Sequence, residues 1–208
     1  QDIKITGYSR SEKTRNKAAE IDVCEVHHTV SSCVAGADLI ILCVPVGAMQ
    51  STFKAAVPYL EKHAIVSDVG SVKSSVIKAI KPIIPKDIFF VPSHPIAGTE
   101  NSGPEAGFAE LFNGRWCILT PIPQTPIEVT KKVRDFWKLL GAEVQEMEAN
   151  HHDLVLSVTS HAPHLIAFTM VGVADEFSKV AKSEVINYSA AGFRDFTRLA
   201  ASDPVMWR

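Results

Sequence analysis

The chain has 208 residues, of which 46% are hydrophobic and 21% are charged, and its formal net charge is −2. This length and composition suit a folded protein with one sizeable core or two smaller ones. The 21 basic residues do not outnumber the 23 acidic ones, so the chain lacks the positive excess that neutralises nucleic-acid phosphates. No nucleic-acid partner is expected.

The apolar segments are short and the cysteines are scattered. No uninterrupted apolar run approaches the roughly 18 residues of a membrane span, and the first residues lack the apolar centre of a signal peptide. Cys24, Cys33, Cys43 and Cys117 form no CxxC pair, which favours buried free thiols. The sequence predicts a cytoplasmic protein with no membrane partner.

Strand-like and helix-like segments alternate over the first two thirds of the chain. Strands are expected at 2–9, 37–46, 64–71, 87–95 and 114–121, and helices at 11–21, 49–62 and 72–84. This β-α-β rhythm predicts a Rossmann-type, doubly wound parallel sheet covered on both faces. In such sheets ligands bind beyond the carboxyl ends of the strands.

The pattern changes after Pro121. One helix, stopped by Gly141, and one short strand follow, and from Asn150 onward only helical segments are expected. Asn150 is the expected cap of the first of these helices. The predicted domains are an α/β nucleotide-binding domain at 1–148 and the start of an all-α domain at 149–208.

Both ends of the sequence suggest part of a longer protein. Doubly wound nucleotide-binding sheets open with a strand and a glycine-rich turn that holds the pyrophosphate, whereas this chain starts at an apparent second strand. At the other end, the chain stops at Arg208 within a helical run. We therefore expect truncation at both ends.

Polar residues at three strand ends are the candidate cofactor contacts. Ser9 and Arg10, with Thr14 nearby, lie where an acidic residue would favour NAD and an arginine accommodates the 2′-phosphate of NADP. The segments "CVPVG" and "SDVGS" end the next two strands, and they contribute Val44, Pro45, Val46, Asp68, Gly70 and Ser71. Taken singly, these segments could equally be turns and helix caps.

In the last third of the chain, the candidate site residues are mostly histidines and arginines. Four histidines and Asp153 lie within "HHDLVLSVTSHAPH", but HxxH lacks the spacing and glutamate of HExxH, so no metal site is predicted. His161 and His164 are instead candidates for lining a pocket. Arg194, Asp195 and Arg198 read by default as a solvated helix face, although arginine is also suited to gripping a carboxylate.

Five segments, in this order, carry a family resemblance: "DVGSVK", "SHPIAGTENSG", "NHHDLVLSVTSHAPH", "GFRDFTR" and "SDPVMW". Together they resemble the prephenate/arogenate (cyclohexadienyl) dehydrogenases of tyrosine biosynthesis, over nearly the whole chain. The resemblance implies oxidative decarboxylation of prephenate or arogenate, with hydride transfer to NAD or NADP. It also implies an all-helical domain that forms a homodimer, and possible feedback inhibition by tyrosine.

The resemblance also implies roles for particular residues. His94 would be catalytic, hydrogen-bonded to the ring hydroxyl of the substrate, and Ser71 would orient that hydroxyl and the nicotinamide. His161 and His164 would line the substrate pocket, and Arg198 would bind a substrate carboxylate. The remaining substrate-site residues implied are Glu100 and Asp195, in a polar network, and Trp207, which would reach the partner subunit's site.

Two other functions stay open. A 3-hydroxy-acid dehydrogenase of similar plan would need a pocket lysine, but Lys179 and Lys182 lie in the solvent-like stretch "EFSKVAKSE". A non-catalytic module that binds an aromatic acid would explain the missing glycine-rich turn. The sequence does not choose between prephenate and arogenate, or between NAD and NADP.

Overall fold

The computed structural model describes residues 3–98, 102–180, 188 and 190–201. The chain divides into two units, residues 1–152 and 153–208, and each is treated by itself. The strands are β1 (Thr6–Gly7), β2 (Glu25–Val26), β3 (Leu39–Leu42), β4 (Ile65–Asp68), β5 (Phe89–Phe90), β6 (Ser93–Pro95), β7 (Trp116–Leu119) and β8 (Glu143–Glu146). The α-helices of the first unit are α1 (Glu12–Glu20), α2 (Val30–Val34), α3 (Val46–Ala56), α4 (Ser74–Ile80) and α5 (Ile127–Leu139), and α6 (Ala149–Leu156) crosses the boundary.

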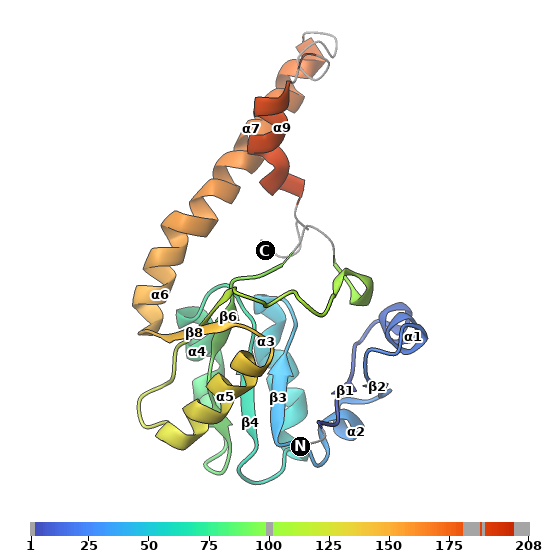
Figure 1. Ribbon diagram of the computed structural model, residues 1–208, viewed down its shortest axis with the longest axis vertical. Coiled ribbons are helices and arrows are strands. Elements are labelled where there is room, and N and C mark those ends of the chain that lie inside the picture. Colours follow the sequence, from blue (N-terminus) through green and yellow to red (C-terminus); the bar gives the residue numbers. More distant parts are fainter. Residues whose placement is uncertain (1–2, 99–101, 181–187, 189, 202–208) are drawn as a thin grey trace. The chain divides into compact units, whose positions relative to one another are not determined.

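The centre of the first unit is the parallel sheet β3-β4-β5 (Figure 1). Every residue of β4 is buried, and its side chains alternate between two cores. Val66 packs with Met49 and Phe53 of α3 and with α4, whereas Ile65 packs on the opposite face with Trp137 of α5. Helices on both faces explain why the strands read as continuous apolar runs.

A second sheet, β6-β7-β8, begins where the same chain segment leaves the first. The amide of Val91 donates to Val66 of β4, and one residue later the carbonyl of Pro92 accepts from Thr120, which follows β7. β6 pairs antiparallel with β7, and β7 pairs parallel with β8. The strand expected at 114–121 therefore exists but runs antiparallel to β6; the described part of the connection between them contains only a short 3-10 turn, Pro104–Ala106, and no α-helix of the βαβ kind.

β1 and β2 form a separate parallel pair. Thr6 pairs with Glu25 and Gly7 with Val26, and among the described residues neither strand joins the β3-β4-β5 ladder. The strand expected at 2–9 is thus short. The fold class itself, a Rossmann-like parallel-sheet domain followed by helices, is confirmed.

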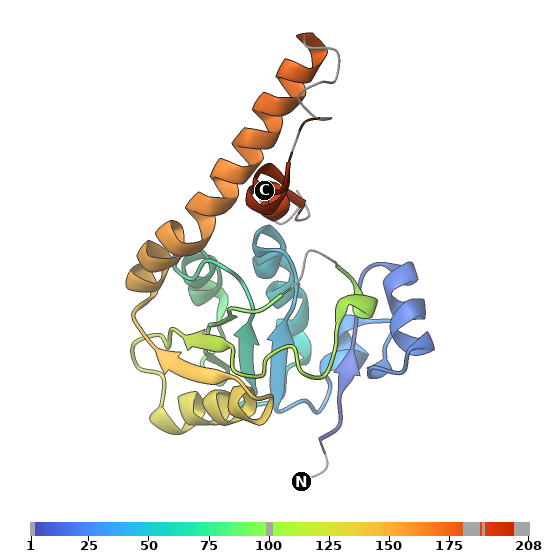
Figure 2. The same ribbon diagram turned by 45° about the horizontal axis from the view of Figure 1, so that its top comes forward.

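The second unit is helical. It contains the π-helical turn η4 (Ser157–His161), the long helix α7 (Ala162–Val180), α9 (Ala191–Thr197) and the 3-10 turn η5 (Arg198–Ala201). α9 lies beside α7 (Figure 2). In the π turn the amide of Ala162 donates to Ser157, five residues back. The widened turn precedes Pro163, which has no amide proton for an ordinary helical bond.

One expectation about this region needs correction. Asn150 does not cap the helix; the Glu148 carboxylate accepts from the amide of His151, and Asn150 lies in the first turn. Among the described residues, Ala149–Phe177 is also one continuous helix that is long and apolar enough to cross a membrane, by length and composition only, with 11% of its apolar window buried. A helix that packs against other helices can have the same length and apolar composition.

The cysteines are free, but burial differs among them. Cys117 in β7 is buried, and desolvation raises the pKa of its thiol to about 12. Cys24 and Cys33 are half-buried, and Cys43 is exposed. The expectation of a buried thiol is therefore correct for Cys117; Cys43 is exposed as a residue, but burial of its sulfur raises the pKa of the thiol to about 11.

Candidate active site at the ends of the strands

Three strand ends meet at one edge of the first unit. Leu42 and Asp68 are register partners at the ends of β3 and β4, and the amide of Val69 donates to Leu42. The segment Val44–Val46 therefore follows β3 beside the turn that follows β4. β6 adds His94, one residue beyond Ser93, whose side chain is tied to β4. This edge is the candidate active site of the unit.

A buried ion pair lies at this edge. The side chains of Asp68 and Lys73 have no exposed surface, and Lys73 Nζ contacts Asp68 Oδ2. The same carboxylate oxygen accepts from the amide of Gly70 at 2.8 Å. Burial raises the pKa of the Asp68 carboxyl, and the ammonium group of Lys73 opposes that rise. Asp68 is one of the residues expected to contact a cofactor; in this structure its Oδ2 accepts from Lys73 and from Gly70.

The ion pair is linked to the strand of His94. Lys73 Nζ donates to the carbonyl of Ser93 at 2.7 Å, in the peptide that joins Ser93 to His94. The Ser93 hydroxyl donates to the carbonyl of Asp68 at 2.6 Å and lies 2.9 Å from the hydroxyl of Ser67. Ser67 in turn donates to Val91 at 2.6 Å. Side-chain bonds thus fasten β6 to β4 beside the candidate base.

His94 contacts a second imidazole. Its Nδ1 lies 2.8 Å from Nε2 of His152, and the two rings meet edge to face. His94 is 9% exposed, and His152 is fully buried in the first turn of α6. The amide of His152 donates to the carbonyl of Glu148, and the Asn150 side chain accepts from Ser74 Oγ at 3.0 Å. The start of α6 is therefore tied to the start of α4.

The other predicted cofactor residues differ in burial: Gly70 is buried, Ser9 is half-buried, and Ser71 and Arg10 are exposed. Ser71 is exposed in the turn between β4 and α4. Gly70 is tightly enclosed, since an added Cβ would lie 2.9 Å from Asp68 Oδ2 and from Met49 Cε. Ser9 is half-buried and its hydroxyl accepts from the amide of Ser11, while Arg10 is exposed.

Thr14 and the "CVPVG" segment lie at helix starts. Thr14 is half-buried in the first turn of α1, and its amide donates to Ser11, the helix cap. Pro45 precedes α3, whose first turn has no side-chain cap. Uncapped amides at a helix start are available to an anionic or polar ligand group.

The predicted substrate residues fall in the second unit or outside the described residues. His161 ends the π turn, and Nδ1 of His164 lies 2.8 Å from the carbonyl of Ser160. Asp195 and Arg198 are exposed, on α9 and η5. Glu100, Trp207 and Lys182 lie outside the described residues.

Sequence reasoning missed three residues that the structure brings to His94: Lys73, Ser93 and His152. A lysine five residues after a buried-strand aspartate was the available signal for the ion pair. Two adjacent histidines at a helix start were a signal for a polar contact, although nothing local identifies His94 as their partner. No group of three or more potential metal ligands occurs among the described residues.

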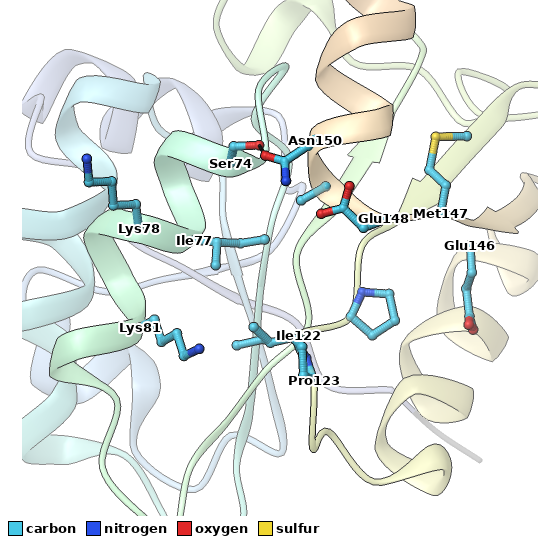
Figure 3. Close-up of a pocket in the computed structure, with 12 residues that line it drawn as sticks. Ser74, Ile77, Lys78, Lys81, Ile122, Pro123, Glu146, Met147, Glu148 and Asn150 are labelled. Atoms are coloured by element: carbon cyan, nitrogen blue, oxygen red, sulfur yellow. Dashed lines mark hydrogen bonds between the residues drawn. The ribbon is translucent and has the colours of Figure 1, made fainter.

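A separate groove of about 530 Å³ lies on another part of the first unit (Figure 3). It lies between α4, the Pro121–Pro123 loop and the start of α6, with Lys78 and Lys81 on one wall and Glu148 on the other. Its described lining includes neither His94 nor Ser71. The groove therefore does not define the chemical site.

The parallel sheet and its polar edge define a nucleotide-binding α/β domain, and comparison with known proteins gives the family. Residues 1–146 match "Prephenate dehydrogenase, nucleotide-binding domain", and residues 148–208 match "Prephenate dehydrogenase, dimerization domain". The chain belongs to the prephenate dehydrogenase family.

Individual relatives agree with this. The chain is 44% identical to a cyclohexadienyl dehydrogenase of Zymomonas mobilis over 208 residues, which is all of this chain and 71% of that protein. It is 34% identical to the crystal structure of Aquifex aeolicus prephenate dehydrogenase with hydroxyphenyl propionate and NAD+, with a TM-score of 0.90 over 100% of this chain and 72% of that one. Synechocystis arogenate dehydrogenase is 27% identical, with a TM-score of 0.75 over 97% of this chain and 72% of that one.

Proposed function

We propose that this protein catalyses the oxidative decarboxylation of prephenate or arogenate to 4-hydroxyphenylpyruvate or tyrosine, with hydride transfer to NAD(P)+, in tyrosine biosynthesis. The observation that carries the proposal is His94. It is a nearly buried imidazole at the strand-end edge, held at 2.8 Å by a second imidazole, in a chain of this family.

The chemistry suits the residue types at this edge. When bound, NAD(P)+ accepts the hydride from ring C4. His94 accepts the proton of the C4 hydroxyl, and an imidazole with an ordinary pKa of about 6.5 is suited to this near neutral pH. Loss of the ring carboxylate as CO2 leaves an aromatic phenolate, which regains the proton from His94, so the protein mainly needs to align the substrate and hold one proton during the step. Ser71 orients the hydroxyl from the neighbouring turn.

The cofactor residues proposed are those of the three strand ends. The uncapped first turn of α3, the close backbone at Gly70 and the exposed Arg10 fit a dinucleotide with polar and anionic groups. Ser9, Arg10 and Thr14 would face the adenosine ribose, and Arg10 makes NADP acceptable beside NAD.

The substrate residues and partners complete the proposal. His161, His164, Asp195 and Arg198 would bind the substrate, with Arg198 on a carboxylate. Glu100 and Trp207 would complete the site. The protein acts as a homodimer in the cytoplasm, consistent with four cysteines that form no disulfide. Feedback inhibition by tyrosine is a further part of the proposal.

The decisive experiment follows NAD(P)H absorbance with the full-length enzyme, crossing prephenate and arogenate against NAD+ and NADP+. Reduction of cofactor with at least one pair, together with release of CO2, is expected. Absence of turnover with all four pairs would refute the proposal. Calorimetry with tyrosine and each cofactor then distinguishes a module that binds tyrosine without dinucleotide.

His94→Asn should lower kcat by roughly 10²- to 10⁴-fold, the usual reach of general acid–base catalysis, and leave cofactor affinity nearly unchanged. His63→Asn is the matched control, because His63 is an exposed histidine at the opposite, amino end of β4 and already adopts φ +67°, which asparagine tolerates. Near-wild-type kcat in the His94 variant would remove His94 from the proposed role.

A further inference from the structure

Nothing in the proposed reaction assigns a task to His152, although it is the most deeply buried imidazole at the site. His152 has no exposed surface and presents Nε2 to Nδ1 of His94 at 2.8 Å. We propose that His152 is a positioning residue that holds His94 in the tautomer protonated at Nδ1, so that the Nε2 lone pair is available for the substrate's proton. This inference rests on the proposed function, because it concerns how His94 becomes a base.

If both imidazoles are neutral, two arrangements of the hydrogen bond between His94 and His152 are possible. Two ring nitrogens at 2.8 Å need one donor and one acceptor between them. If His152 donates, then Nε2 of His94 carries the proton and His94 cannot act as a base through that nitrogen. If His94 donates from Nδ1, its Nε2 carries a lone pair. Only the second arrangement is compatible with proton acceptance.

The hydrogen bond from His94 Nδ1 to His152 Nε2 is also possible when His94 is protonated. After His94 gains a proton at Nε2, it becomes an imidazolium that still donates from Nδ1 to His152 Nε2. His152 must remain neutral at that nitrogen, because two donors cannot share one contact. The bond from a charged donor is stronger than the neutral one, so His152 stabilises the form of His94 that the reaction produces.

The backbone on both sides of the contact is fixed. His94 lies in β6, paired with Ile118 of β7, and Lys73 holds the preceding carbonyl. His152 lies one turn into α6, where its amide donates to Glu148 and the adjacent Asn150 accepts from Ser74. Ser74 follows Lys73 directly. The two imidazoles are therefore anchored to one short segment, which suits a device that sets orientation.

The test combines a conservative and a non-conservative variant of the full-length enzyme. In His152→Gln the side-chain carbonyl can accept from Nδ1 near the position of the imidazole Nε2, whereas His152→Leu offers no acceptor. We expect kcat to fall about 10- to 100-fold in His152→Leu, the usual cost of removing an orienting partner, and His152→Gln to recover most of that loss. KM for substrate and cofactor should change little, because the proposal gives His152 no contact with either ligand.

A spectroscopic reading tests the tautomer independently of turnover. With 15N-labelled histidine, and His94 assigned by its loss in His94→Asn, wild-type His94 should show a pyridine-type Nε2 and a protonated Nδ1. The His152→Leu variant should lose this preference. A wild-type His94 protonated at Nε2, or unchanged kcat in His152→Leu, would overturn the proposal.

The outcomes separate the inference from the proposed function. If no substrate pair is turned over while the NMR result holds, the proposed function fails and the positioning of His94 stands. If His152→Leu does not fold, the wild-type spectrum and the kcat of His152→Gln still decide: a wrong tautomer, or a glutamine variant as inactive as His94→Asn, counts against the proposal.

Discussion

Lys73 is the residue whose burial most needs an explanation. An ammonium group with no exposed surface is costly unless it is paired and hydrogen-bonded, and Lys73 has the Asp68 carboxylate and the Ser93 carbonyl. Apolar residues of similar volume could fill the same space. What they could not do is hold the peptide before His94. The ion pair therefore connects the stability of the sheet edge to the placement of His94, the proposed base.

Replacing Lys73 by Met should destabilise the protein by roughly 3–5 kcal/mol at neutral pH, because it leaves a buried carboxylate without its partner. Adding Asp68→Leu should recover part of this loss. Chemical denaturation of the two single variants and the double variant measures the coupling. Additive single effects would contradict a direct role of the pair.

The pH dependence of Lys73→Met follows from the direction of the Asp68 shift. Burial raises the folded-state pKa of this carboxyl above its ordinary 3.8, and the variant lacks the opposing lysine. The folded protein then binds more protons than the unfolded chain, so the stability of the variant should fall as pH rises from about 3.8 towards neutrality. A loss of stability independent of pH would mean that packing, rather than charge, dominates.

At the scale of elements, periodicity predicted what depends on neighbouring residues in the chain. The apolar run of β3, the amphipathic α5 and its stop at Gly141 could be read directly. The antiparallel pairing of β6 with β7 could not, because it depends on how a loop returns the chain.

Some residues of the candidate site could be predicted from the local sequence, and others could not. His94 stood out locally, between apolar and small residues. His152 is 58 positions away in sequence, and only tertiary folding brings the two rings together. The Glu148 cap was missed because Asn150 is the better cap by residue type, although Glu148 occupies the right position.

Gly141 provides an element-scale prediction. It adopts φ +88°, and an added Cβ would lie 2.0 Å from Asn113 Oδ1 and 3.2 Å from Asn113 Cα. Gly36 has φ +72° with nothing within 4 Å, so it is the matched control. Gly36→Ala should cost about 1–2 kcal/mol for the left-handed backbone, and Gly141→Ala about 1–3 kcal/mol more for crowding. Equal losses in thermal or chemical unfolding would show that Asn113 moves aside freely.

At the scale of the whole molecule, the described part of the helical unit has exposed apolar side chains. On α7, Leu165 and Phe177 are more than half exposed, at 68% and 61%. The segment matches a dimerization domain. Exposed apolar area of this kind is typical of a surface that is covered on association.

Leu165→Glu should shift the protein from dimer to monomer in sedimentation velocity, because a buried unpaired carboxylate opposes association. Ile127→Glu is the control, since Ile127 is 77% exposed at the start of α5 in the first unit. An unchanged dimer in Leu165→Glu would place the dimer contact elsewhere.

The attachment of β6 has a consequence for motion during the catalytic cycle. The backbone at His94 is paired with Ile118 on one side, and Lys73 and the hydroxyls of Ser67 and Ser93 fasten the preceding residue on the other. Moving this backbone would break several bonds at once, so the backbone at His94 is held in place. With His94 as the proposed base, any induced fit around a substrate would bring other segments towards it, and the rate of closure would depend on those segments.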